Sequence, residues 1–294
     1  MNFHSPTLQD KEWVTKAFLD GQTDCCEYCF GNIYMWSDIY GNKIYNDNGI
    51  FVSADFTDEP VFCYPIGNGD KKSTILKLIE FAKTLNVDLE FFGLTEKDKD
   101  ELNFLFPNQF DIHETRDFFD YLYKSEDLAN LVGRKYHSKK NHVSYFEKTF
   151  DWQYEPINKD NIADCLLLNE HWQGLNKQKN PEEITDEYEA IKKALNNYSE
   201  IGFEGGALKI QGEIVAFTFG ERLNNNTFCT HVEKAYGNIR GAYQMINREF
   251  ARQLQDRYEF INREEDTGSE GLRRAKLSYQ PHRLIIKYSA IYKG

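Results

Sequence analysis

The sequence predicts an α/β (α+β) protein built from two copies of one fold, each a mixed, mostly antiparallel sheet flanked by helices. The chain has 294 residues, which suits two domains of ordinary size. Hydrophobic residues make up 40% of it and aromatic residues 15%, which is enough for packed cores. Both halves also show one order of elements, namely hairpin, strand, loop, helix, strand, helix and strand.

In the first half, a hairpin is predicted where two strand-like runs, Lys43–Tyr45 and Ile50–Ala54, flank a short polar turn. The predicted elements that follow are a strand at Val61–Tyr64, an amphipathic helix at Ser73–Leu85, a strand at Asp88–Phe92, a charged helix at Glu96–Phe104 and a strand at Asp117–Tyr123. An aromatic cluster precedes them and is expected to fill the core of this domain: Tyr28, Phe30, Tyr34, Trp36 and Tyr40.

The second half repeats the order with clearer signals. Gln211-Gly212 is a two-residue turn typical of a hairpin, between strands at Ala207–Ile210 and Ile214–Gly220. The later predicted elements are a strand at Thr227–Val232, helices at Tyr243–Gln255 and Glu270–Leu277, a strand between them at Tyr258–Asn262 and a final strand at Arg283–Ile291. We therefore expect an N-terminal domain (1–130), a basic inter-domain segment (131–150) and a C-terminal domain (151–294). One large domain with alternating elements is the alternative.

Charge and hydropathy narrow the classes of protein. The net charge of −12 opposes non-specific binding to nucleic acid or to an anionic membrane, although a local basic groove can still bind either partner. No apolar run is long enough to span a bilayer, and the first ten residues do not resemble a secretory signal. We expect a cytoplasmic protein without an integral membrane segment; its oligomeric state stays open.

Six cysteines in a chain of this length do not indicate a disulfide scaffold. Cys25, Cys26 and Cys29 lie close together, as metal ligands often do, but no second Cys or His pair follows nearby at the spacing of a zinc site. We therefore expect free thiols and no metal, and the role of these three residues stays open. The remaining cysteines, including Cys229, lie in apolar runs and are expected to be small core residues.

The strand at Thr227–Val232 leads through a glycine-bearing turn into a helix, which is an arrangement that binds phosphate. Backbone N–H groups at a helix start point at an anion and the helix dipole favours it, while Gly237 and Gly241 permit positive φ. An ordinary strand-to-helix turn is the alternative. The residues expected to bind the anion are Val232, Gly237, Asn238, Ile239, Arg240, Gly241, Ala242 and Tyr243.

This region resembles the GNAT acyltransferases. In that family the turn before the central helix carries an Arg-Gly pyrophosphate motif, and a later helix carries Ala and, four residues on, Tyr. Arg240-Gly241 and Ala275 with Tyr279 stand in those places. Tyr243 departs from the pattern, because a glycine is usual there. The resemblance implies acyl-coenzyme A as co-substrate and Tyr279 as the general acid for the leaving group; a buried packing role is the alternative for Tyr279.

Two longer motifs resemble proteins of the phosphatidylglycerol lysyltransferase C-terminal (DUF2156) type. They are the runs 262–266 and 271–281 near the C-terminus, and the basic run Arg134–Val143. That group is similar in build to the Fem-type transferases, which have paired GNAT domains and take aminoacyl groups from tRNA. This chain has no membrane-spanning half, so the resemblance implies acyl transfer more firmly than any acceptor.

Acidic side chains near the predicted strand ends are candidates for proton transfer. Glu264, Glu265 and Asp266 are adjacent, and mutual repulsion would raise a pKa among them if they were buried together. Glu264 and Asp266 are preferred, since alternate residues of an extended segment share a face; a solvated loop paired with arginines is the alternative. Glu233 is expected to orient the acceptor or to pair with Lys234. His231 is expected on the same side of the strand as Glu233, as a core histidine.

The basic run forms the third candidate surface. On a helix, Lys135, Lys139 and His142 would share a face. With Lys140 and Arg263, that face is expected to bind a polyanion, either the phosphates of a donor or RNA, so that tRNA is a possible partner. A solvated helix that balances local acids is the alternative.

These observations predict an acyltransferase. It would move an acyl or aminoacyl group from an activated donor, with acyl-coenzyme A favoured, to an amine or hydroxyl of a small-molecule or aminoacyl acceptor by direct attack. Two alternatives remain, which are a transferase that depends on aminoacyl-tRNA and a non-catalytic GNAT-like module that binds a ligand.

Overall fold

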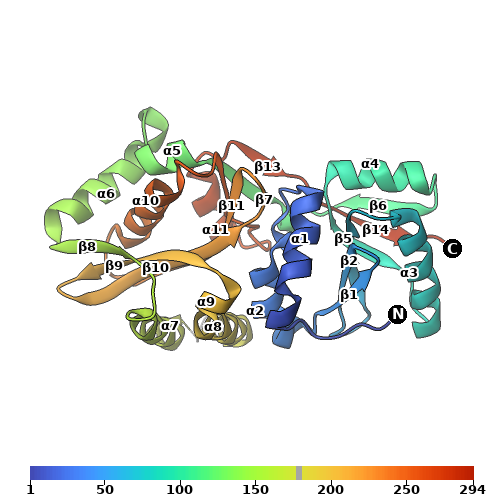
Figure 1. The fold of residues 1–294 in the computed structure, drawn as a ribbon. Coiled ribbons are helices and arrows are strands. Elements are labelled where there is room, and N and C mark those ends of the chain that lie inside the picture. The colour runs from blue at the N-terminus through green and yellow to red at the C-terminus, as the bar shows by residue number, and fades with distance from the viewer. Residues whose placement is uncertain (177–180) are drawn as a thin grey trace.

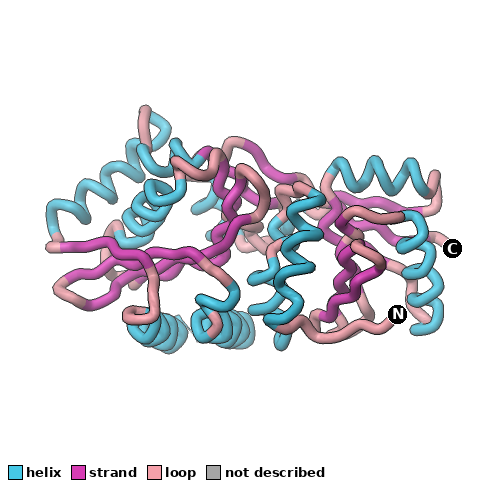
Figure 2. The backbone as a smooth tube through the Cα atoms, viewed as in Figure 1, coloured by secondary structure: helices cyan, strands magenta, loops and turns pink. Residues whose placement is uncertain are grey.

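The computed structural model describes residues 1–176 and 181–294 as two mixed sheets flanked by helices (Figures 1 and 2). The first sheet has the strand order β1 (Lys43–Asp47), β2 (Ile50–Asp55), β3 (Val61–Cys63), β5 (Glu90–Leu94), β14 (Tyr288–Tyr292) and β6 (Phe110–Glu114), with β4 (Ile66–Gly67) paired to β2. The second has the order β13 (Arg283–Ile285), β7 (Asp120–Lys124), β12 (Phe260–Asn262), β11 (Thr227–Ala235), β10 (Glu213–Arg222), β9 (Glu204–Ile210) and β8 (Trp152–Pro156). The predicted fold class is confirmed.

One pair of strands in each sheet is parallel, β3 with β5 and β11 with β12, and a helix connects each pair. A parallel pair requires such a crossover, which α3 and α10 supply by packing an apolar face on the sheet. The described helices longer than four residues are α1 (Lys11–Gly21), α2 (Phe30–Tyr40), α3 (Lys71–Leu85), α4 (Glu96–Leu105), α5 (Ser125–Asn130), α6 (His137–Thr149), α7 (Ile162–Asn176), α8 (Pro181–Asn196), α10 (Ala242–Leu254) and α11 (Glu270–Leu277). Among the described residues, no helix is both long and apolar enough to cross a membrane.

The sheets exchange strands across the predicted domain boundaries. β7 lies within the predicted N-terminal domain (1–130), yet it pairs with β12 and β13 of the second sheet. The single strand predicted at Arg283–Ile291 is two strands: β13 stays in the second sheet, and β14 crosses to pair with β5 and β6 of the first. Sequence order assigns a strand to the half in which it occurs, whereas backbone hydrogen bonds decide its sheet. The duplication of one fold stays a prediction.

Helices α1 and α2 lie between the two sheets (Figure 1). One hydrophobic cluster joins Phe18 of α1 and Phe30 of α2 to Leu168 of α7 and Ile191 of α8. The aromatic cluster that was expected to fill the core of the first domain therefore packs across the junction between the halves. Tyr40, at the end of α2, is outside the core, with 46% of its surface exposed.

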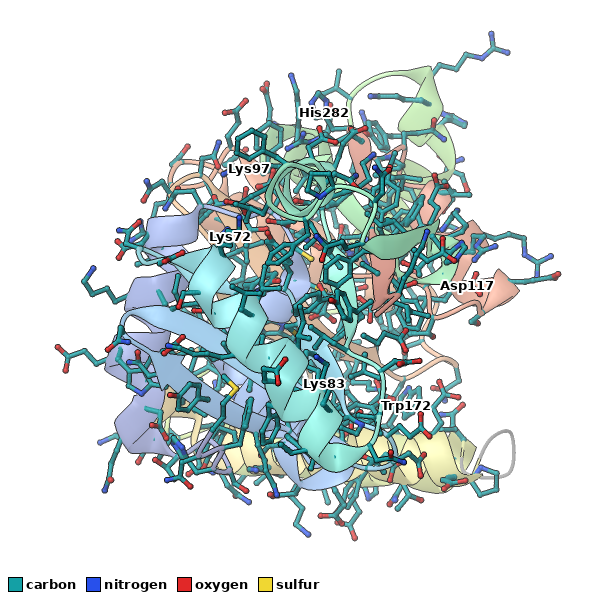
Figure 3. The ribbon with its side chains drawn as sticks, turned by 90° about the vertical axis from the view of Figure 1, so that its right-hand side faces the viewer. Lys72, Lys83, Lys97, Asp117, Trp172 and His282 are labelled. Atoms are coloured by element: carbon teal, nitrogen blue, oxygen red, sulfur yellow. The ribbon has the colours of Figure 1, made fainter. Side chains whose placement is uncertain are left out.

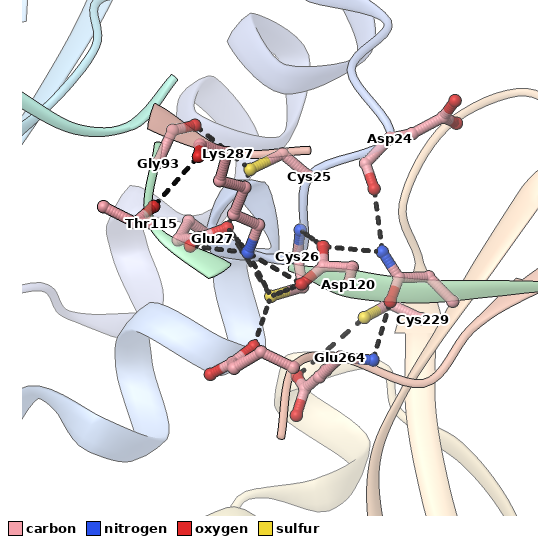
Figure 4. A network of polar contacts seen from close by, with 12 residues as sticks. Asp24, Cys25, Cys26, Glu27, Gly93, Thr115, Asp120, Cys229, Glu264 and Lys287 are labelled. Carbon is pink, nitrogen blue, oxygen red and sulfur yellow. Dashed lines mark hydrogen bonds and ion pairs between the residues drawn. The ribbon is translucent and has the colours of Figure 1, made fainter. Parts of the chain in front are cut away.

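A buried ion pair holds this junction (Figure 4). Lys287 lies in the link between β13 and β14, and its side chain is fully buried. Its ammonium is 2.7 Å from Asp120 Oδ1 on β7 and 2.7 Å from both carboxylate oxygens of Glu27. Asp120 also accepts from the Cys26 N–H at 2.8 Å and from Asn262 Nδ2 at 2.9 Å. Burial opposes the charge of Lys287, but Asp120 and Glu27 keep its pKa well above the usual value.

We expect Lys287→Met to lower the free energy of unfolding by about 3–5 kcal/mol, because it leaves Asp120 and Glu27 buried without their cation. The change is read from urea denaturation followed by circular dichroism. Lys293→Met is the matched control: its side chain is 53% exposed, so a change within about 0.5 kcal/mol is expected. Equal stability of the two variants would show that the buried pair does not hold the junction.

Candidate functional site

The candidate site lies where β11 and β12 separate. These parallel strands pair only over Thr227–Cys229 and Phe260–Asn262. Beyond this pairing, β11 continues to Ala235, while the segment that follows β12 turns away at Glu264. Glu264 has a φ of +57°, which is uncommon for a residue other than glycine and marks local strain. The carboxyl ends of parallel strands are a common place for ligands in α/β sheets.

A β-bulge in β11 redirects the side chains on this strand. The register between β10 and β11 shifts between Phe219 and Gly220, opposite His231. A bulge interrupts the regular alternation of side chains, so residues two apart no longer share a face. Glu233 contacts Asn247 of α10, whereas His231 packs near Phe203 in the core cluster of α7 and α8. The prediction that His231 and Glu233 lie on the same side of the strand is therefore wrong.

Four of the predicted site residues come together with one that was not predicted, and we call this group the arginine pocket: Lys139, Glu233, Asn247, Arg263 and Tyr279. Arg263 Nη2 is 3.0 Å from Glu233 Oε1, and Asn247 Nδ2 donates to Glu233 Oε2 at 3.0 Å. The Arg263 guanidinium lies 4.8 Å from the centroid of the Tyr279 ring, and Lys139 Nζ lies 4.0 Å from it. Within the described part of the chain, Arg263 Nη1 and Asn247 Oδ1 are buried and have no hydrogen-bond partner.

The charges of the arginine pocket favour an anion. Two cations, Lys139 and Arg263, face one carboxylate, Glu233. Burial and the charge of Arg263 lower the pKa of Lys139. Burial opposes the charge of Arg263 as well, but Glu233 raises its pKa, so the guanidinium stays charged. Burial also raises the pKa of Tyr279, which keeps the hydroxyl protonated as a potential acid.

Glu264 faces a different cluster from its neighbour Arg263. Its Oε1 is 2.7 Å from His231 Nδ1, and the other ring nitrogen, Nε2, is 3.1 Å from Glu221 Oε1. The Gly31 N–H donates to the same Glu221 oxygen at 2.7 Å. Burial opposes a charge on the ring, but Cys229 and then the carboxylates of Glu221 and Glu264 hold the pKa of His231 well above its usual value. Burial raises the pKa of Glu264, and His231 opposes that rise.

Asp266 is fully buried and fully bonded. Its carboxylate accepts from Arg273 at 2.7 and 2.9 Å, from Arg116 at 3.2 Å, from the Tyr121 hydroxyl at 2.6 Å and from the Gly268 N–H at 3.0 Å. Burial opposes ionisation, but Arg273 and these hydrogen bonds hold the pKa of Asp266 well below its usual range. Arg273 also binds Asp117, which projects from the surface (Figure 3). These contacts favour an anchoring role, and proton transfer by Asp266 stays a prediction.

The turn that was predicted to bind phosphate packs against helices. Gly241 has a φ of +91°, and a Cβ there would lie 2.5 Å from the His142 carbonyl oxygen of α6. The Arg240 guanidinium lies 4.3 Å from the Tyr145 ring of α6. Tyr243 accepts a hydrogen bond from Trp172 of α7 at 3.2 Å (Figure 3 labels Trp172). Val232 and Ala242 are buried in the core, and Ile239 packs against it, while Gly237 and Asn238 are exposed.

Only part of the basic segment lies on the predicted helix, which includes Lys139 and His142 but not Lys135. Helix α6 begins at His137, so Lys135 lies in the preceding 3-10 turn, where it pairs with Asp127 at 3.3 Å. Lys139 points instead at Tyr279, and Lys140 is exposed. Lys135 also lines an open surface pocket beside Lys124, Gln280 and His282.

Two residues that support the site, Lys276 and Asn247, were not predicted from the sequence. Lys276 of α11 is buried, and its ammonium donates to the backbone carbonyls of Arg263, at 2.6 Å, and Glu265. It therefore holds the loop that carries Arg263 and Glu264. The only signal for it was its position within the motif at 271–281. Asn247, which holds Glu233, had no signal, because nothing in the pattern of α10 separates it from a solvated residue.

Comparisons with known proteins identify the family and the fold of the chain. Residues 21–291 match the family described as "Phosphatidylglycerol lysyltransferase, C-terminal", and the chain belongs to this family. A conserved protein of unknown function from Bacteroides thetaiotaomicron is 38% identical over the full length of both chains, with a TM-score of 0.95. The C-terminal domain of a putative lysylphosphatidylglycerol synthetase from Agrobacterium fabrum has a TM-score of 0.72 at 12% identity, covering 98% of this chain and 93% of its own.

The fold is also shared with FemX, at a TM-score of 0.60 and 9% identity, over 98% of this chain and 97% of that one. An uncharacterised protein of Mycoplasmoides gallisepticum is 28% identical over 60% of this chain. The match spans 56% of the length of that curated relative. The predicted resemblance to the phosphatidylglycerol lysyltransferase C-terminal type is thus confirmed. The family is described by a lysyltransferase activity, and the likeness to FemX concerns the fold alone.

We expect Gly241→Ala to lower the free energy of unfolding by about 2 kcal/mol or more, because a side chain there meets the α6 backbone and opposes the positive φ. Urea denaturation measures it. Gly237→Ala is the matched control in the same turn, since a Cβ there meets nothing within 4 Å. If both variants keep the stability of the parent, the packing of α6 does not require a glycine at position 241.

Proposed function

We propose that this chain transfers an aminoacyl or acyl group from an activated donor directly to an amine or hydroxyl acceptor, in the arginine pocket. One observation carries the proposal: a charged, buried guanidinium keeps one nitrogen, Arg263 Nη1, without a partner beside Tyr279, at the point where β11 and β12 separate. An unsatisfied buried donor is costly unless a ligand completes it. Its partner would be an anionic group of the donor or the oxygen that becomes negative during transfer.

The residues of the pocket suit the steps of direct transfer. Attack of the acceptor on the donor carbonyl places negative charge on the carbonyl oxygen, and Arg263 Nη1 would donate to it. Glu233, held by Arg263 and Asn247, would orient the acceptor and take its proton. Collapse of the intermediate breaks the bond to the leaving oxygen or sulfur, which the Tyr279 hydroxyl would protonate. No covalent enzyme intermediate is needed.

We propose an aminoacyl donor ahead of acyl-coenzyme A. The family is named for transfer of lysine, and lysyl-tRNA would supply phosphates for Lys139 and Arg263. The net charge of −12 restricts an RNA to a small footprint around this pocket. The feature that favours binding of coenzyme A is the start of α10, where Arg240, Gly237 and Asn238 are all exposed. However, the close packing of Gly241 against α6 already accounts for a glycine at this position, so its presence does not require a bound phosphate.

Tyr279→Phe is expected to slow transfer by on the order of 10²-fold and to leave donor binding nearly normal, as for loss of a positioned acid. The assay follows loss of radiolabelled lysine from lysyl-tRNA in the presence of a panel of amine and hydroxyl acceptors. Tyr258→Phe is the matched control, because Tyr258 is buried in the same hydrophobic cluster without contacting the pocket. Equal rates for the two variants would return Tyr279 to a packing role.

Binding measurements separate the two donors. If tRNA is the carrier, log K should fall with log[salt], and Lys139→Gln should flatten the slope by about 0.7–0.9 when it removes one phosphate contact. Lys148→Gln, on an exposed position of α6, is the control and should keep the slope. Calorimetric binding of coenzyme A that Arg240→Glu abolishes would favour the second candidate instead. Arg240 is exposed, so this variant avoids the clash expected at Gly241.

A further inference from the structure

We propose that Cys29, Cys229 and His231 form a zinc site that joins the two halves of the molecule, with Glu264 at its fourth position. One ligand atom of each of the first three residues lies within 4.8 Å of the others. Cys29 directly precedes α2, in the first half, and the other two ligands lie on β11, in the second half. No ligand comes from the arginine pocket, so the inference is independent of the proposed function.

The geometry suits a small tetrahedral ion. Zinc binds sulfur at about 2.3 Å and nitrogen at about 2.0 Å, which puts its ligand atoms roughly 3.3–3.8 Å apart. The three ligand atoms lie within 4.8 Å of one another, so small side-chain movements without a change of fold would bring them to these separations. Glu264 Oε1 is 3.9 Å from Cys229 Sγ and 2.7 Å from His231 Nδ1, which places its carboxylate beside two of the three ligands. Thiolate and imidazole together favour zinc over magnesium or calcium.

The surroundings of His231 resemble the outer contacts of a metal-bound histidine. Glu221 faces Nε2 at 3.1 Å and is itself held by the Gly31 N–H. A carboxylate in this place orients the ring and leaves Nδ1, on the side of Glu264, for the metal. Asn32 Nδ2 donates to Glu264 Oε1 at 3.4 Å and steadies the fourth ligand.

Burial strengthens the case. Cys29 and Cys229 are 1% and 0% exposed, and the His231 side chain is 1% exposed. A divalent cation would deprotonate both thiols and balance the acids.

Two other groups of metal-ligand residues occur in the described residues, and both already have a cation. They are Cys25, Glu27 and Asp120, and Cys26, Asp120 and Glu265. Asp120 and Glu27 bind the buried ammonium of Lys287 at 2.7 Å, and Cys26 Sγ lies 3.4 Å from it. A metal there would repel that ammonium, whereas no lysine or arginine contacts the cluster of Cys29, Cys229 and His231 among the described hydrogen bonds and ion pairs.

The test uses the full chain, purified without a histidine tag from zinc-supplemented culture. Mass spectrometry of metals should find about one zinc per chain, and Cys29→Ser or Cys229→Ser should lose most of it. Cys165→Ser, a buried cysteine of α7 away from the cluster, is the matched control and should keep the zinc. Glu264→Gln should weaken zinc binding by roughly 10–100-fold.

A second measurement covers the case in which the cysteine variants fail to fold. The parent chain, freed of metal by a chelator, is titrated with Co²⁺, which should produce the charge-transfer absorption of bound thiolates. Zinc binding should release protons from the two thiols, as calorimetry in two buffers would show. A parent chain that takes up neither metal, or that contains a Cys29–Cys229 disulfide as isolated, would overturn the proposal.

Discussion

The buried, charged side chain of Lys287 lies where the chain passes from one sheet to the other. Both sheets depend on its ion pair with Asp120 and Glu27. The link that carries it places β13 beside β7 and β14 between β5 and β6. Its main partner, Asp120, also holds Asn262, the last residue of β12. The same carboxylate therefore fixes the junction of the halves and the position at which β12 ends, so the geometry of the candidate site rests on a buried ion pair outside it.

Where β12 ends, two consecutive residues serve two different environments. Arg263 enters the arginine pocket on the side of α10, and Glu264 meets His231 near the first half. The bulge at His231 has the same effect on β11, because it directs the side chains of His231 and Glu233 to opposite sides of the strand. A strand of regular alternation would have put both side chains into one cluster. The strained φ of Glu264 and the buried Lys276 ammonium keep the two consecutive side chains apart.

Sequence patterns correctly predicted the features that neighbouring residues in the sequence determine. Helix α11 has the predicted bounds, the hairpin turn lies at Gln211-Gly212, and the motif residues Arg263 and Tyr279 lie together. The exchange of β7 and β14, the bulge, and the cover of Gly241 by α6 depend on contacts between distant segments, for which one sequence has no signal. Cys29 illustrates the same limit, because its neighbours Cys229 and His231 are distant in sequence and no local spacing indicates them.

Gly241 shows how one motif is open to two physical explanations. A glycine of positive φ at a helix start permits a phosphate to approach the backbone, and it equally permits another helix to do so. Here the approaching group is the backbone of α6, whose own Lys139 extends to Tyr279. The helix that covers the turn thus supplies a cation to the arginine pocket. Under the proposed function, anion recognition would move from the backbone amides at the start of α10 to the side chains of Lys139 and Arg263.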